Sequence, residues 1–341
     1  MPDTLKPAEL HAATLTLDTH VDIPWPETPD PRSETNRCVD YPKMTAGGLK
    51  AVVFAAYLPQ GLRTPEGFAA AAQRAEAMLR AIRATASGGD RRIASRSTDV
   101  EFARAEGGTS VLMAVENGYA MGDDLSRLAL WRGLGACYVT LTHNGHNQLS
   151  DSAIPMASLG DGPTLHGGLS DLGRAAIAEM NALGLLVDIS HVAKSAMMQA
   201  VSLSRSPVVA THTCCRALRD HPRNLDDEQL DAVASVNGVV QITAVPAFLR
   251  NPDADGRYRA SVADMADHID YAVKRIGLEH VGLSSDFDGG GGVEGWRSAA
   301  DSANLTAELM RRGYDAPKIA HLWAGNFLRC MRMAEGVAAG S

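Results

Sequence analysis

Near its N-terminus the chain reads Leu15-Thr16-Leu17-Asp18-Thr19-His20-Val21-Asp22, a short apolar run that ends in a histidine and an aspartate. The run is too short for an ordinary helix and rich in strand-forming residues, so we predict a buried strand over 15–21. His20 and Asp22 lie two residues apart, and a strand would therefore point both side chains the same way. Such a pair suits the binding of one divalent ion.

The segment at the end of this strand helps to separate two kinds of α/β fold. An open, doubly wound sheet usually carries a glycine-rich phosphate-binding loop at this point, and Asp18–Asp22 is no such loop. The glycine run Gly289–Gly292 follows the last apolar run and precedes no clear helix, so we predict a flexible loop there. Seven further apolar runs resemble the first: Leu49–Leu58, Ser110–Glu116, Ala136–Thr142, Leu185–Ser190, Val208–Thr211, Gly238–Val245 and His280–Ser285.

Helical spacing fills the intervals between these runs. Gly67–Ala86 is alanine-rich and amphipathic, and Ser170–Leu183 begins with an N-cap residue and ends before Gly184. Eight strands, most of them followed by a helix, predict a TIM-like (β/α)8 barrel rather than a doubly wound sheet. The other predicted helices are Val192–Leu203, Asp226–Ser235, Ser261–Ile276, Asp301–Arg312 and Lys318–Ala334.

The composition is that of an ordinary folded protein, with 341 residues of which 45% are hydrophobic and 21% charged. This length suits a single barrel domain over residues 1–341, with loop insertions near 24–42 and 149–168. The net charge of −8 argues against a nucleic-acid partner or a polybasic membrane anchor. The N-terminus, Met1–Leu17, has no apolar run long enough for a signal-peptide core, and no run in the chain approaches the roughly 20 apolar residues of a transmembrane helix. We therefore expect a cytoplasmic protein without a membrane partner.

The five cysteines show no zinc-finger spacing, and their number is odd. Cys214 and Cys215 are adjacent, so their Cα atoms would lie about 3.8 Å apart, closer than ordinary disulfide geometry allows. We therefore expect free, mostly structural thiols in a reducing compartment.

Titratable side chains recur where the predicted strands end. In a parallel barrel all those ends open onto one face, where the active site is built. Taken singly, each residue has an ordinary alternative, as a loop histidine, a helix-capping aspartate or a solvated carboxylate. Because they recur at successive strand ends, we predict one metal site. The residues are His20, Asp22, Glu116, His143, His191, His212, Asp286 and Asp288.

The types of ligand favour a particular kind of metal site. Three histidines with carboxylates and without cysteine suit Zn²⁺ or a similar first-row ion. With five ligands available, two ions that share Glu116 are more economical than one crowded site. Two ions about 3.5–4 Å apart can hold a hydroxide between them and polarise a carbonyl group. The chain has no Gly-x-Ser-x-Gly motif, so a serine nucleophile is not supported, and we interpret Ser190 as packing or hydrogen bonding.

Taken together, the motifs resemble the renal (membrane) dipeptidase family and its bacterial relatives, which are binuclear zinc peptidases among the amidohydrolase-like barrels. The resemblance runs over nearly the whole chain, and its motifs occur in order at suitable separations. They are Asp18-Thr19-His20-Val21-Asp22-Ile23-Pro24-Trp25, Val115-Glu116-Asn117-Gly118, Leu141-Thr142-His143-Asn144, Asp188-Ile189-Ser190-His191-Val192, Thr211-His212-Thr213, Pro222-Arg223-Asn224-Leu225 and Ser285-Asp286-Phe287-Asp288-Gly289.

The resemblance implies how the metal ligands divide. His20 and Asp22 would bind one zinc ion, and His191 and His212 would bind the other. Glu116 would bridge the two ions.

The resemblance also implies roles for the residues around the metal ions. His143 would stabilise the oxyanion of the tetrahedral intermediate. Arg223 would bind the substrate's C-terminal carboxylate through its planar fork. Asp286 would carry a proton from the attacking water to the leaving amine, with Asp288 as the less favoured alternative.

The implied function is a zinc-dependent dipeptidase that hydrolyses L,L-dipeptides, tolerates a D-residue at the second position and forms a homodimer. Two alternatives stay open: an N-acyl-amino-acid amidase or lactonase that uses the same binuclear site, and an inactive barrel that serves as a binding module. The chain differs from the best-known members in having Asn117 where glycine is common and in its loops 24–42 and 149–168. We also expect no signal peptide or lipid-anchor tail, so the membrane location of the animal enzymes does not transfer. The divergent loops leave the preferred dipeptide open.

Overall fold

A barrel of parallel strands forms the centre of the structure, a computed structural model that describes residues 5–23 and 29–340. Within these residues eight strands pair in the order β1-β2-β4-β5-β6-β7-β8-β9. The chain after β9 returns to β1, where the Asp286 N–H donates to the His20 carbonyl oxygen at 3.1 Å. The predicted TIM-like barrel is thus confirmed. The strands are β1 (Leu17–Asp22), β2 (Ala51–Tyr57), β4 (Thr109–Glu116), β5 (Ala136–Thr140), β6 (Leu186–Asp188), β7 (Val208–Thr213), β8 (Val239–Thr243) and β9 (Val281–Ser284).

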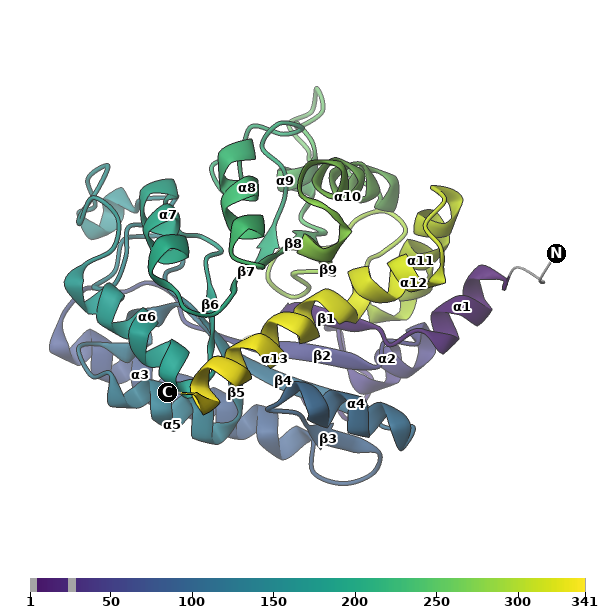
Figure 1. The fold of residues 1–341 in the computed structure, drawn as a ribbon, viewed down its shortest axis with the longest axis horizontal. Helices are drawn as coiled ribbons and strands as arrows, with labels where there is room; N and C mark the ends of the chain where they lie inside the picture. The colour runs from purple at the N-terminus through teal and green to yellow at the C-terminus, as the bar shows by residue number, and fades with distance from the viewer. Residues whose placement is uncertain (1–4, 24–28, 341) are drawn as a thin grey trace.

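Helices surround this barrel, and the C-terminal helix lies across one end of it (Figure 1). The α-helices are α1 (Pro7–Ala13), α2 (Tyr41–Gly47), α3 (Pro65–Thr85), α4 (Ser97–Ala105), α5 (Ser126–Leu134), α6 (Asp171–Leu183), α7 (Lys194–Leu203), α8 (Asp227–Ser235), α9 (Pro246–Leu249), α10 (Val262–Ile276), α11 (Ser302–Arg311), α12 (Ala316–Ala320) and α13 (Asn326–Ala339). Shorter helical turns are η1 (Gly118–Met121), η2 (Ala157–Leu159), η3 (Leu278–His280), η4 (Ala299–Asp301) and the π-helical η5 (His321–Gly325).

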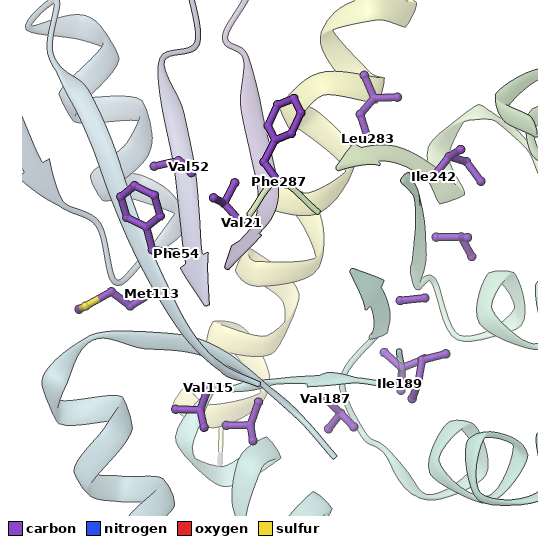
Figure 2. Close-up of a cluster of buried hydrophobic side chains, with 14 of the residues drawn as sticks. Val21, Val52, Phe54, Met113, Val115, Val187, Ile189, Ile242, Leu283 and Phe287 are labelled. Atoms are coloured by element: carbon purple, nitrogen blue, oxygen red, sulfur yellow. The ribbon is translucent and has the colours of Figure 1, made fainter. Parts of the chain in front are cut away.

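Two apolar layers hold the barrel, one on each side of its wall. The outer layer packs the strands against the helices, and Figure 2 shows part of it, including Phe54, Met113 and Ile242. The inner layer fills the amino-terminal end of the barrel, where Leu17 packs in one cluster with Phe327 of α13. Because this end is filled, the opposite end of the barrel is left for polar side chains.

All eight predicted strands exist, with ends shifted by a few residues, but several elements escaped prediction. The strand β3 (Arg91–Ile93) pairs with the start of β4 at Thr109–Val111. It has three residues, two of them arginines, and so lacks the apolar run that marks the other strands. The helices α1, α2, α4, α5 and α9 were also missed, and each has nine residues or fewer.

The last predicted helix, Lys318–Ala334, is one continuous helical segment with a π-helical turn inside it. The turn, η5, separates α12 from α13. Directly after it the Asn326 amide donates to the carbonyl oxygens of Leu278 (2.7 Å) and Val281 (2.8 Å). The wider turn therefore coincides with a side-chain contact that ties the last helix to the start of β9.

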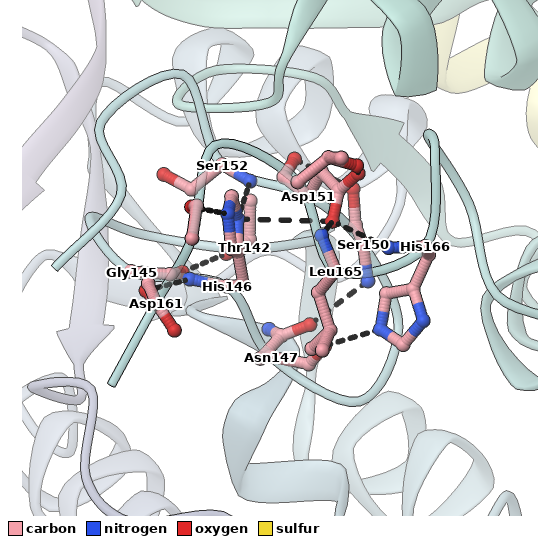
Figure 3. Close-up of polar contacts among 12 residues, drawn as sticks. Thr142, Gly145, His146, Asn147, Ser150, Asp151, Ser152, Asp161, Leu165 and His166 are labelled. Carbon is pink, nitrogen blue, oxygen red and sulfur yellow. Dashed lines mark hydrogen bonds and ion pairs between the residues drawn. The ribbon is translucent and has the colours of Figure 1, made fainter. Parts of the chain in front are cut away.

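The predicted insertion near 149–168 is a loop held by the buried Asp151 (Figure 3). Asp151 accepts hydrogen bonds from the N–H groups of Leu165 (2.8 Å), His166 (3.0 Å) and Gly168 (2.9 Å). The loop is therefore anchored from its inner side. Of the other predicted insertion, near 24–42, residues 24–28 lie outside the described part of the chain.

Replacing Asp151 by alanine is expected to lower the free energy of unfolding by about 2–4 kcal/mol. Three backbone N–H groups would lose a charged acceptor, and each such hydrogen bond contributes about 1.5–3 kcal/mol, partly recovered by water. Chemical denaturation measures the global effect, and limited proteolysis within 149–168 detects local opening of the loop. The exposed Asp123→Ala is the control and should change neither reading. Unchanged stability and unchanged cleavage for Asp151→Ala would contradict the anchoring role.

No helix in the described residues is both long and apolar enough to cross a membrane.

Candidate metal centre

The five predicted ligands come together at the carboxyl end of the barrel. His20 and Asp22 lie at the end of β1, and Glu116 is the last residue of β4. His191 follows β6, and His212 is the second-last residue of β7. All except Asp22 are buried. The structure thus brings these five side chains together at one end of the barrel.

Glu116 lies at the centre of this group. Its Oε2 is 3.5 Å from His20 Nε2, whereas its Oε1 is 3.3 Å from His191 Nε2 and 3.5 Å from His212 Nε2. His20 Nε2 is also 3.2 Å from Asp22 Oδ1. The two carboxylate oxygens of Glu116 thus face two different sets of ligand atoms.

Several atoms in this group are buried without a hydrogen-bond partner in the described residues. They are His20 Nε2, Asp22 Oδ1 and Glu116 Oε2. Buried polar atoms in proteins are almost always paired, and unpaired ones cost free energy. Nitrogen and carboxylate oxygen are the ligand atoms that zinc and similar ions take. The residues present therefore fit a divalent metal, and the atoms of three overlapping groups lie within 4.8 Å of one another.

The other ring nitrogen of each ligand histidine is held by a polar side chain. A hydrogen bond at Nδ1 fixes the orientation of the ring and leaves the Nε2 lone pair free for a metal. The pairs are His20 Nδ1 with Tyr138 Oη (2.8 Å), His191 Nδ1 with Asn144 Oδ1 (3.0 Å) and His212 Nδ1 with Thr211 Oγ1 (3.0 Å).

The surrounding charges favour a positive charge at His20 and neutral rings at His191 and His212. Burial lowers the pKa of His20, but the carboxylates of Glu116 and Asp22 outweigh burial and raise it well above its ordinary value. Burial lowers the pKa of His191 and of His212 well below the ordinary value. A metal ion binds to neutral imidazole nitrogens, and nearby carboxylates attract its positive charge. The centre offers both kinds of group.

Irregular backbone helps to bring these side chains to one place. The pairing of β1 with β2 contains an extra residue between Asp18 and Val21, and β7 has a similar irregularity between Ala210 and Thr213. Such bulges turn side chains toward sites at the rim of a barrel. His191 adopts a left-handed φ of 66°, which is costly for a residue with a side chain.

His143 lies at the more open side of the centre. Its Nε2 is 3.9 Å from Glu116 Oε1, and its ring lies 4.0 Å from that of His191 and 4.8 Å from that of Tyr57. Burial, assisted by the charge of Arg223, lowers the pKa of His143 to about 3. A neutral imidazole at this place can donate a hydrogen bond without carrying a charge.

Arg223 is buried beside the ligands rather than exposed in a charged loop. One guanidinium nitrogen, Nη2, donates to the His212 carbonyl oxygen at 3.3 Å, and Cζ lies 5.4 Å from the Phe248 ring centre. The Nε atom has no partner within the described residues, and burial lowers the pKa of the group to about 10. Such an arginine is suited to pairing with an anionic group brought by a ligand.

The two aspartates that follow β9, Asp286 and Asp288, have different surroundings in the structure. Both carboxylate oxygens of Asp288 already have partners: Oδ1 accepts from the Cys38 N–H at 2.8 Å, and Oδ2 pairs with Arg37 Nε at 3.3 Å. Asp286 faces the metal centre in one group with His20 and Asp22. Its side chain accepts no hydrogen bond from the described residues. Burial, followed by the charge of Asp22, raises its pKa well above the ordinary value.

The glycine run after Asp286 is a tight hydrogen-bonded turn rather than a structureless loop. The N–H groups of Gly289 (3.1 Å) and Gly291 (2.8 Å) both donate to the Asp286 carbonyl oxygen. A Cβ at Gly289 would lie 2.4 Å from Asp286 Oδ1 and 2.6 Å from Asp22 Oδ2. Glycine is therefore required for the two carboxylates to approach, which the sequence interpretation as a flexible loop did not anticipate.

The loop over 149–168 contacts the backbone of two site histidines. Ser152 Oγ donates to the His143 carbonyl oxygen at 2.6 Å, and the Ala153 N–H donates to the His191 carbonyl oxygen at 2.7 Å. This insertion therefore supports the centre directly.

Several residues around the ligands were not assigned from the sequence: Tyr57, Tyr138, Asn144, Asp188 and Thr211. Asn144 follows His143 in the sequence and Thr211 precedes His212, so their positions next to predicted site residues could have identified them. Tyr138 lies in the middle of an apolar strand and gave none. Ser190 makes a hydrogen bond to Asp188 Oδ1 at 2.9 Å, which confirms its interpretation as a hydrogen-bonding residue.

The fold and the ligand set define a (β/α)8-barrel protein with a candidate divalent-metal centre at the carboxyl ends of its strands. Residues 6–341 match the family model of the membrane dipeptidases, peptidase family M19. The chain belongs to this family, as the motifs predicted.

Individual relatives agree with this assignment. The dipeptidase aclJ of Aspergillus oryzae is 37% identical over 248 residues, which are 72% of this chain and 57% of that protein. The matched segment thus spans little more than half of the fungal protein. Among solved structures, the probable dipeptidase PvdM of Pseudomonas aeruginosa is 29% identical with a TM-score of 0.89, covering 97% of this chain and 98% of that one. The dipeptidase AC, a metallopeptidase of family M19, is 26% identical with a TM-score of 0.82, covering 95% and 99%.

Proposed function

We propose that this protein is a dipeptidase that hydrolyses the peptide bond of dipeptides with the help of two zinc ions. The placement of Glu116 carries the proposal, because one of its oxygens faces His20 and the other faces His191 and His212. His20 and Asp22 would hold one ion, His191 and His212 the other, and Glu116 would bridge them. Two ions held by these residues would supply an activated water and polarise the scissile carbonyl.

The residues around the ions would bind the substrate and move the proton. Arg223, buried and with no partner for its Nε among residues 5–23 and 29–340, would hold the C-terminal carboxylate. His143 would donate a hydrogen bond to the carbonyl oxygen as negative charge develops on it. Asp286 would take a proton from the attacking water and deliver it to the leaving amine. The names of the relatives, dipeptidases in each case, support this reaction.

A screen of L,L- and L,D-dipeptides with zinc supplied tests the reaction class. We expect hydrolysis of dipeptides with a free C-terminal carboxylate and little hydrolysis of the matching dipeptide amides. A set of N-acyl amino acids and lactones is assayed in parallel. If those are hydrolysed and no dipeptide is, the amidase or lactonase alternative replaces the dipeptidase.

Purified protein is expected to contain close to two divalent ions per chain. The five ligands divide around Glu116 into two sets, and each set can hold one ion. Elemental analysis after mild purification measures the content, and dialysis against a chelator followed by zinc should restore it. No bound metal before or after zinc addition would contradict the proposed function.

We further propose a cytoplasmic location and a homodimer. The five cysteines are free, in keeping with a reducing compartment. Cell fractionation tests the location, and light scattering of the purified protein tests the oligomeric state.

A further inference from the structure

The hydroxyl group of Thr211 lies among the ligands of both halves of the proposed centre. Its Oγ1 is 3.0 Å from His212 Nδ1 and 3.3 Å from His20 Nδ1. The same oxygen donates to Asp188 Oδ2 at 2.7 Å. Thr211 and Asp188 are both fully buried. One hydroxyl therefore contacts a histidine from each half and a buried carboxylate.

The surroundings of this hydroxyl determine where its proton goes. Asp188 Oδ2 accepts the hydrogen bond from the Thr211 hydroxyl, so the single Thr211 proton points to Asp188. The Thr211 lone pairs then face the two histidine rings and can only accept. His212 and His20 must accordingly each carry a proton on Nδ1, and in the neutral ring of His212 this leaves the Nε2 lone pair facing Glu116.

The two histidines depend on Thr211 to different degrees. His20 Nδ1 also contacts Tyr138 Oη at 2.8 Å, and that hydroxyl donates its proton to the Thr19 carbonyl oxygen at 3.0 Å. His212 Nδ1 has no second partner in the described residues. Loss of the Thr211 hydroxyl would therefore affect His212 more than His20.

The backbone irregularity in β7 accounts for the unusual position of Thr211. Neighbouring residues of a regular strand point to opposite faces. The pairing of β7 with β8 shifts between Ala210 and Thr213, and both Thr211 and His212 reach into the centre. A regular strand would place only one of the two there.

We propose that Thr211 is a positioning residue shared by both metal sites, which sets the tautomer of His212 and assists that of His20. The inference rests on the proposed function, since it takes those histidines as ligands. Asp188 is the anchor of this arrangement, because its carboxylate fixes the direction of the Thr211 proton.

Zinc titration of the metal-free protein compares Thr211→Val with Thr211→Ser and with the wild type. Valine keeps the shape of threonine and removes the hydroxyl, so we expect zinc affinity to fall about 10–100-fold at one or both sites. Serine keeps the hydroxyl and should restore most of the affinity. The matched control is Thr140→Val, because Thr140 Oγ1 also donates to Asp188 Oδ2 at 2.7 Å but contacts no ligand histidine. It should bind zinc as the wild type does.

A second measurement uses the wild-type protein and does not require any variant to fold. Nitrogen NMR of the imidazole rings in the metal-free protein should show His212 protonated at Nδ1 and not at Nε2. The opposite tautomer would overturn the proposal, as would unchanged zinc affinity in a folded Thr211→Val protein, or an equal loss in Thr140→Val. A wild type that binds no zinc would instead overturn the proposed function.

Discussion

Replacing Asp286 by asparagine is expected to lower kcat for dipeptide hydrolysis about 10²–10⁴-fold, the usual contribution of a positioned general acid–base group. Asparagine has nearly the same size as aspartate and keeps an oxygen acceptor, but it cannot take up and release a proton. The Asp286 carboxylate faces the metal centre and is free of hydrogen bonds from the described residues. Its backbone N–H is fixed to the His20 carbonyl oxygen, so the variant should keep the same position.

The neighbouring Asp288 provides the matched control for this experiment. It accepts from the backbone N–H of Cys38 and pairs with Arg37, which itself donates to the Asp22 carbonyl oxygen at 3.2 Å. Asp288→Asn should therefore lower the melting temperature and leave kcat within a few-fold of the wild type. The metal content of both variants is measured, because loss of an ion would mimic loss of a proton carrier. Near-wild-type kcat for Asp286→Asn with both ions bound would exclude the proposed role.

The barrel was predictable because its strands carry strong local signals. Runs such as Leu49–Leu58 are buried on both sides, so almost every position is apolar and the strand stands out in the sequence. β3 has no such apolar run. It pairs only with the first residues of β4, and β5 pairs with the remainder of the same edge. Short helices such as α2 depend on contacts with distant segments, and the sequence alone does not show these.

The grouping of the candidate ligands was predictable from the sequence, but the side chains that hydrogen-bond to them were not. Histidines and carboxylates at successive strand ends form a pattern that few other arrangements explain. Tyr138 and Asp188 act from inside the barrel, across from residues more than 20 positions away. Which side chain reaches which ring nitrogen depends on the bulges in β1 and β7, and no motif encodes those. The structure also explains why asparagine can stand at position 117, where glycine is common in the family. The φ of Asn117 is 89°, a conformation that favours glycine and that asparagine tolerates.

Replacing Arg223 by methionine is expected to lower kcat/KM for dipeptides by roughly 30- to 3000-fold, mainly through KM. Loss of one partner of a buried, hydrogen-bonded charge pair costs about 2–5 kcal/mol, and each 1.4 kcal/mol is a factor of ten. Methionine fills most of the arginine's volume against Phe248, so the wall of the site should stay packed. The loss should appear with a free C-terminal carboxylate and be absent with the matching dipeptide amide.

The comparison of acid and amide separates recognition from damage to the site. If Arg223 binds the carboxylate, wild type prefers the acid strongly, whereas Arg223→Met treats acid and amide nearly alike. Equal loss of activity on both substrates would instead indicate a disturbed metal centre. The substitution could cause this because Arg223 donates to the His212 carbonyl oxygen. Arg216→Met is the control from the same loop, because its guanidinium contacts the carbonyl oxygens of His221 and Pro222 instead. An unchanged KM for dipeptides in Arg223→Met would remove the reason to choose a peptide with a free C-terminus over an uncharged amide or lactone.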